Sequence, residues 1–103
     1  MENIIKGDIK MTKGQEVFWE EIKRLQDEIL CIYSLKLSRY DTKEDLLKDV
    51  TYDTIYSLME LLDGFRNENI QGNVIFLPSG KSINSKHDPL HNYCENYLSI
   101  SKL

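Results

Sequence analysis

The chain has 103 residues and a net charge of −4, with 41% hydrophobic and 29% charged residues. A length near 100 residues is typical of one domain with one modest core, and it excludes an enzyme built from separate cofactor and substrate domains. The composition is too apolar for a disordered chain. The negative balance opposes nucleic-acid binding, which requires a basic field.

The longest apolar run covers only residues 29–33, far short of the length needed to cross a bilayer. The N-terminus begins without an apolar signal region. Two cysteines, Cys31 and Cys94, lie 63 positions apart and do not form a disulfide framework. We therefore expect a cytoplasmic protein with two free thiols and no contact with membranes.

Residues 1–11 show no clear periodicity and are expected to form an arm that is flexible or a short strand. A first helix is predicted from Thr12, which fits a capping box with Gln15, to about Leu37. Its apolar residues recur at steps of three and four, which is typical of one buried stripe on a helix. They are Phe18, Ile22, Leu25, Ile29 and Ile32 or Tyr33.

A second helix is predicted to begin at Asp49 or Thr51 and to end at Gly64, a residue suited to a left-handed terminator. Residues 43–49 are expected to form a separate helical turn, because Thr42 and Asp45 make a weaker capping pattern. The second helix is apolar around most of its circumference. This pattern indicates a central helix or one that a partner partly covers.

A β-hairpin is predicted from residues 73–77 and 81–84, which flank the turn sequence of residues 78–81. A last helix is predicted from Asp88, as the N-cap before Pro89, to Leu98 or Ser99. Residues 12–103 are therefore expected to form a single α+β domain. An all-α fold with an incidental hairpin is the alternative.

Catalytic motifs are not visible in the sequence. The chain has no Gly-x-Ser-x-Gly elbow and no signature of a catalytic cysteine, so we expect a protein that is not an enzyme and has no cofactor. The alternative is a small metal-binding domain that uses His87, His91 and Cys94, which are spaced by four and three residues. A packed thiol and a solvated imidazole explain the same residues without a metal.

Negative charge is concentrated in the middle of the chain. Residues 41–68 hold eight acidic and three basic side chains, an excess larger than that of the whole chain, with tyrosines interleaved. Tyrosine supplies buried area and carboxylates steer a basic partner, so we expect a protein-binding surface for a basic protein or a second copy. Its candidate residues are Tyr40, Asp45, Asp49, Tyr52, Asp53, Tyr56, Met59 and Glu60.

Two segments carry a resemblance to known proteins. Residues 45–64, with the run Asp-Thr-Ile-Tyr-Ser-Leu-Met-Glu-Leu-Leu-Asp-Gly, precede the predicted hairpin and the segment Asp88-Pro-Leu-His-Asn-Tyr-Cys-Glu-Asn-Tyr-Leu98. Together these segments, about half of the chain, resemble small uncharacterised acidic bacterial proteins, some of which act as immunity proteins that neutralise a toxin. The resemblance implies a bacterial, non-enzymatic protein and no particular site residues.

Overall fold

The computed structural model describes residues 11–71, 75–85 and 87–101, so the predicted arm, apart from Met11, lies outside the described residues. Two long helices, α1 (Lys13–Lys36) and α2 (Lys43–Leu62), are joined through a short 3-10 helix, η2 (Leu37–Arg39). A second 3-10 helix, η3 (Leu90–Tyr93), leads directly into one turn of helix, α3 (Cys94–Tyr97). These elements account for the helical structure of the described residues.

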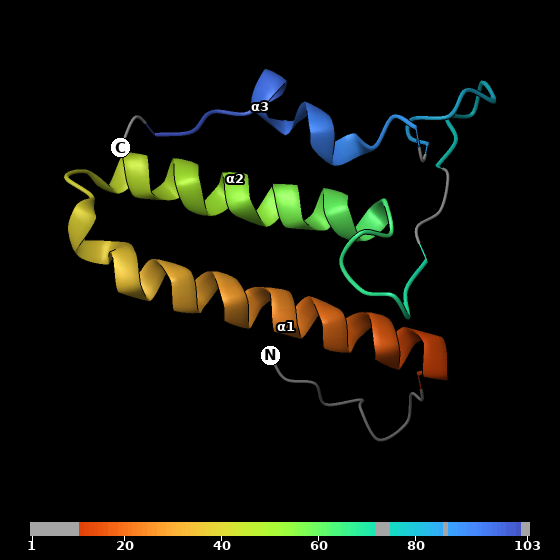
Figure 1. Ribbon diagram of the computed structural model, residues 1–103, viewed down its shortest axis with the longest axis horizontal. Coiled ribbons are helices and arrows are strands. Elements are labelled where there is room, and N and C mark those ends of the chain that lie inside the picture. The colour runs from red at the N-terminus through yellow and green to blue at the C-terminus, as the bar shows by residue number, and fades with distance from the viewer. Residues whose placement is uncertain (1–10, 72–74, 86, 102–103) are drawn as a thin grey trace.

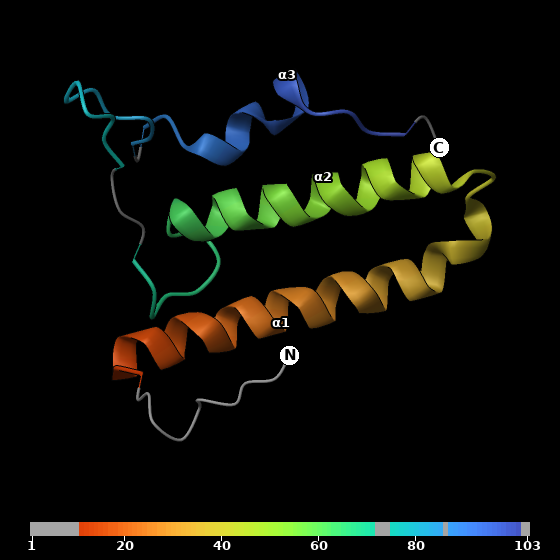
Figure 2. The ribbon, with the colours of Figure 1, turned by 180° about the vertical axis from the view of Figure 1, so that it is seen from behind.

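The elements lie side by side rather than around a central core. Helices α1 and α2 form an antiparallel hairpin, and the segment with η3 and α3 runs along the opposite flank of α2 (Figure 1). Seen from behind, α2 again lies between α1 and the C-terminal segment (Figure 2). The molecule measures 44 × 39 × 25 Å, so it is flattened. A helical hairpin of this kind has two broad faces, and the remaining residues of a small chain can cover only part of them.

Helix α1 begins and ends close to the predicted positions. The Thr12 hydroxyl accepts the N–H of Gln15 at 3.1 Å, and the Gln15 side chain accepts the N–H of Thr12 at 2.9 Å. This reciprocal pair is the expected capping box, which satisfies two N–H groups that have no partner within the helix. The helix then continues without glycine or proline to Lys36.

The predicted start of the second helix is wrong. Helix α2 begins at Lys43, six residues before Asp49, and the side chain of Thr42 accepts the N–H of Asp45 at 3.1 Å. No glycine or proline separates residues 43–49 from the rest, so the helical turn and the helix are continuous. At the other end Gly64 has a φ of 82°, and the N–H of Phe65 donates to Glu60 O, as in a Schellman motif.

The expected α+β fold is also wrong. The described residues form no strand and no sheet, and β pairing is limited to the isolated bridges Phe76–Ser82 and Ser85–Asp88. The turn is present, because the N–H of Gly80 donates to Leu77 O, but both Phe76 and Leu77 are exposed. A two-stranded hairpin is marginal unless it packs on other elements, and here that packing is missing.

The last predicted helix is shorter than expected and begins differently. Asp88 pairs with Ser85 and accepts the Tyr93 hydroxyl, so it is occupied before the helix starts. The N–H groups at the start of η3 instead face the carboxylate of Asp63, at the end of α2. The capping group is therefore supplied by a distant residue that local sequence spacing does not reveal.

The buried interior of the described residues is small and mixed in character. Five apolar residues are buried, and so are four polar ones. The apolar set is Leu25, Tyr33, Leu61, Pro89 and Cys94, and the polar set is Glu21, Asp49, Asn84 and His91. Buried polar groups require partners, so each polar residue defines a place where segments distant in sequence are held together.

Candidate functional site

The Asp63 carboxylate is a junction of three segments at the end of α2. It accepts the Asn84 amide at 3.2 Å, and its Oδ2 accepts the backbone N–H of His91 at 3.0 Å. The same Oδ2 lies 2.8 Å from Nδ1 of the His91 ring. With an Asp63 side chain only 2% exposed, this junction is shielded from water. Asp63 orients the His91 ring through Nδ1, and Nε2 is left for a different neighbour.

Hydrogen bonds control the charge of Asp63. Burial by itself would raise the pKa of this carboxyl, but donors from the backbone of His91 and Leu90 and from two side chains outweigh it and place the pKa below its usual value. Burial, together with Asp63 and Glu60, raises the pKa of the Cys94 thiol. Cys94 therefore stays protonated at neutral pH and is a poor nucleophile.

A polar pocket of about 310 Å³ adjoins the Asp63 junction. Its lining comes from α2, η3 and α3: Tyr52, Tyr56, His91, Asn92 and Glu95. The two phenol rings are nearly parallel, 21° apart with centroids separated by 6.2 Å, and the His91 ring meets Tyr56 edge-on at 5.5 Å. The walls are thus flat aromatic faces with hydroxyl, amide and carboxylate groups among them.

The metal alternative finds no support in this geometry. Nδ1 of His91 is engaged by Asp63, Cys94 is buried with a raised pKa, and His87 is exposed. Across residues 11–71, 75–85 and 87–101, no three His, Cys, Asp or Glu side chains are grouped as metal ligands. The i, i+3 spacing of His91 and Cys94 reflects instead two side chains that pack against α2.

Two residues of the predicted acidic surface face inward. The Asp49 carboxylate, 8% exposed as a residue, accepts the Tyr40 hydroxyl at 2.7 Å and the hydroxyl and N–H of Ser101, each at 2.6 Å. Burial would raise the pKa of Asp49, but the bonds from Ser101 and Tyr40 outweigh it and lower the pKa. Asp49 therefore holds the C-terminal segment against α2, and the Tyr40 hydroxyl binds the same carboxylate.

The remaining residues of that predicted surface separate into different environments. Tyr52 and Tyr56 line the polar pocket, and Met59 is half-buried. Asp53 accepts the hydroxyl of the buried Tyr33. Glu60 lies 3.7 Å from a guanidinium nitrogen of Arg66. Asp45 is half-buried and lies in the first turn of α2. The structure thus brings together only the two tyrosines as an accessible pair.

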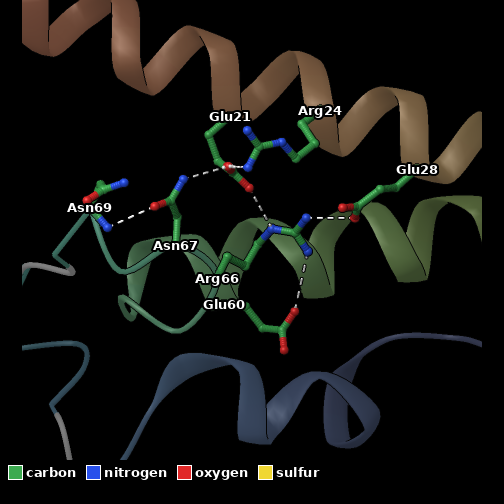
Figure 3. Close-up of polar contacts among 7 residues, drawn as sticks. All are labelled: Glu21, Arg24, Glu28, Glu60, Arg66, Asn67 and Asn69. Atoms are coloured by element: carbon green, nitrogen blue, oxygen red, sulfur yellow. Dashed lines mark hydrogen bonds and ion pairs between the residues drawn. The ribbon is translucent and has the colours of Figure 1, made fainter.

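A polar cluster that the sequence analysis missed lies on one broad face of the α1–α2 hairpin (Figure 3). Glu21, 2% exposed, accepts Arg24 at 2.9 Å, Asn67 at 3.0 Å and Nε of Arg66 at 3.3 Å. Arg66 also donates to Glu28 at 2.7 Å. The cluster fastens the loop after α2 onto α1. The seven-residue spacing of Glu21 and Glu28 was a sequence signal that both lie on one helix face.

The opposite face of the hairpin carries an apolar groove of about 600 Å³ between α1 and α2. Successive helical residues differ by about 100°, so Trp19 and Leu30 lie roughly 200° around α1 from Glu21 and Glu28. Trp19 is 57% exposed and Leu30 is 58% exposed. The groove lining is Trp19, Ile22, Lys23, Leu25, Gln26, Ile29, Leu30, Val50, Thr54 and Leu58.

In the described part of the chain, neither long helix combines the length and the mean hydropathy that a bilayer-spanning helix needs. Comparisons add no constraint on function: the sequence matches no protein-family model, and neither a curated protein nor a solved structure matches it.

Proposed function

We propose that this chain is a non-enzymatic protein-binding domain that pairs with a second copy of itself through the α1–α2 groove. The supporting observation is the open apolar groove, in which Trp19 and Leu30 are more than half exposed. Contiguous exposed apolar surface on a small domain is typical of an interaction site. The proposal keeps the protein-binding class expected from the sequence and moves the binding surface to the other side of α2.

The spacing of apolar residues along both helices supports a helical partner. Residues 47, 50, 54, 58 and 61 on α2 recur at steps of three and four, interrupted by Thr54, and residues 19, 22, 26, 29, 30 and 33 on α1 form a similar stripe, interrupted by Gln26. Such stripes form the inner seams of four-helix bundles. Two helical hairpins placed face to face would complete such a bundle, each copy covering the other's groove.

The size of the groove face matches a dimer interface. Helices of 24 and 20 residues are about 36 and 30 Å long at roughly 1.5 Å per residue. With axes about 8–10 Å apart, the face measures about 30 × 20 Å, and its corrugated accessible surface approaches the roughly 800 Å² that each partner of a standard interface buries.

The charge of the groove also supports a like partner. Lys23 is the one charged side chain in its lining, and Lys23 already pairs with Asp27 of the same helix at 2.6 Å. A face without net charge gives no preference for a partner of opposite charge. A self-complementary apolar contact, as in a two-fold symmetric dimer, fits this pattern.

The two cysteines support placing this protein in a reducing compartment such as the cytoplasm. Both thiols are free, and Cys31 is exposed on α1. Exposed free thiols persist in compartments that keep thiols reduced. The cytoplasmic location is part of this proposal.

The proposal is tested by mass and by fluorescence. Analytical ultracentrifugation at micromolar concentrations should give about twice the chain mass of 12.1 kDa. Trp19 is the sole tryptophan of the sequence, so its emission should shift to shorter wavelength as concentration increases and the groove closes. If the protein is monomeric at every concentration up to about 1 mM, self-association is refuted. A Kd of about 1 mM corresponds to a binding free energy of only roughly 4 kcal/mol.

A matched pair of variants locates the interface. Leu30→Glu places a charge in the groove and should give a monomer, whereas Leu35→Glu makes the same change at a 79% exposed position of α1 outside the groove lining and should leave the dimer intact. Circular dichroism checks that both variants keep their helices. If Leu35→Glu dissociates the dimer and Leu30→Glu does not, the groove is not the interface.

A further inference from the structure

The polar pocket beside His91 contains an unusual set of uncommitted groups. The hydroxyls of Tyr33, Tyr40 and Tyr93 each donate to a carboxylate. By contrast, within the described part of the chain, no hydrogen bond or ion pair is formed by the side chains that line the pocket with His91: Tyr52, Tyr56, Asn92 and Glu95. Carboxylate, phenol and amide groups are thus gathered around one cavity beside two aromatic faces, and in the described part of the chain none of these polar groups is bonded to another protein group.

The electrostatic surroundings of this pocket are negative. Burial is the main reason that the pKa of Tyr52 and of Tyr56 is raised, and Glu95 adds to both shifts. Asp53 acts on Tyr52 and Glu60 acts on Tyr56 in the same direction. The lining contains no lysine or arginine, and Nδ1 of its imidazole is held against Asp63. A ligand that complements this pocket must therefore carry positive charge.

We propose that this pocket binds the guanidinium group of an arginine side chain presented by a basic partner protein. A guanidinium is planar and stacks on tyrosine faces, and its five donors suit a carboxylate, phenol oxygens and an amide oxygen at once. A volume of about 310 Å³ is at the small end of the range for ligand pockets and is sufficient for one arginine side chain. The site is separate from the apolar groove and does not depend on dimer formation.

The shape of the pocket favours a guanidinium over other cations. The nearly parallel rings of Tyr52 and Tyr56 offer flat faces to a flat cation, whereas a compact ammonium has three donors instead of five and no plane to stack on the rings. A metal ion would need anionic or imidazole ligands, whereas phenols are neutral at pH 7 and the raised pKa values of Tyr52 and Tyr56 move them further from ionisation. Glu95 then supplies the ion pair.

The test uses the full chain and two small probes. N-acetyl-arginine amide is titrated into isotopically labelled protein and followed by NMR, with N-acetyl-citrulline amide as the neutral isostere. The arginine probe should cause saturable shifts at Tyr56 and Glu95, in the millimolar range expected for a single contact. The citrulline probe should bind at least tenfold more weakly. Equal responses to the two probes would overturn the proposal.

Two variants separate the pocket from the general effect of charge. Glu95→Gln keeps the shape and hydrogen-bonding capacity of an exposed side chain and should weaken binding of the arginine probe at least tenfold. Glu20→Gln makes the same change in net charge on α1, far from the pocket lining, and should leave binding unchanged. Equal affinities of Glu95→Gln and wild type would refute the site. Ultracentrifugation of the same samples shows that the outcome is independent of self-association.

Discussion

The two broad faces of the α1–α2 hairpin differ in what covers them. One face is covered by the loop after α2, and Arg66 and Asn67 of this loop are bound by the buried carboxylate of Glu21. The other face ends in exposed apolar side chains such as Trp19 and Leu30. The covered face shows how buried polar groups can attach a loop to the helices of a small chain. The bare face shows that the chain has more apolar residues than its own core buries.

This contrast reverses the usual relation between polarity and burial at several positions. A carboxylate in the interior is stable here because several donors converge on it, and removal of such a group leaves those donors without partners. An exposed leucine on the hairpin contributes little to the monomer because it remains in water. Substitutions at the two kinds of position should therefore have very different effects on the free energy of unfolding.

The largest effect is expected for Asp63→Ala. The substitution removes the acceptor of the His91 N–H groups and one partner of the Asn84 amide, at a side chain that is 2% exposed. Loss of one partner of a buried pair typically costs about 3–5 kcal/mol, and this variant should be destabilised by that amount in urea denaturation at fixed protein concentration. The matched control is Asp27→Ala, whose exposed pair with Lys23 should matter by less than about 1 kcal/mol. Equal losses would contradict the fastening role of Asp63.

Acid should have a smaller effect, because protonation changes the charge of a carboxyl and leaves the group in place. The pKa values of Asp63 and Asp49 are lowered in the folded chain, so their stabilisation is present above the unfolded pKa of about 3.9 and is lost as pH falls through the folded values. The free energy of unfolding should therefore decrease below about pH 4. In Asp63→Asn this decrease should be shallower, and an unchanged slope would contradict the role assigned to Asp63.

The smallest effect is expected at an exposed apolar position. Leu35 is 79% exposed and lies outside the groove lining. Leucine and glutamine have similar helix propensities, so Leu35→Gln should change the free energy of unfolding by less than about 0.5 kcal/mol. Thermal denaturation followed by circular dichroism measures this change. A loss comparable to that of Asp63→Ala would show that the outer face is packed in a way that its exposure does not reveal.

Local signals in the sequence were sufficient for the long helices, except for the start of α2, and insufficient for the rest of the fold. The Thr12 capping box and the left-handed Gly64 are formed by neighbours in sequence, and both were predicted correctly. The hairpin prediction failed because strand propensity at Phe76 and Leu77 does not supply a surface for the strands to pack on. The start of the last helix was wrong because its N–H groups are bound by Asp63, 28 residues from His91.

The candidate sites illustrate the same limit. Tyr52 and Tyr56 were included in the predicted surface because tyrosines are interleaved with the acidic residues of this segment, and the structure places both at the polar pocket. Composition could not separate an internal carboxylate such as Asp49 from a surface one, because burial depends on Ser101, 52 residues away. The apolar groove was not predicted as a site, since a stripe at helical spacing normally packs against the protein's own core.

Asp49 in α2 and Asp63 at its C-cap also fix the length of the C-terminal segment between two anchor points. Asp63 holds the segment at His91 and Asp49 holds it at Ser101, at points separated by 14 helical residues or about 21 Å. The eleven residues from 91 to 101 must span this interval, partly as helix and partly extended. A deletion or insertion between the anchors would detach one of them, so this stretch can vary in side chains but has little freedom in length.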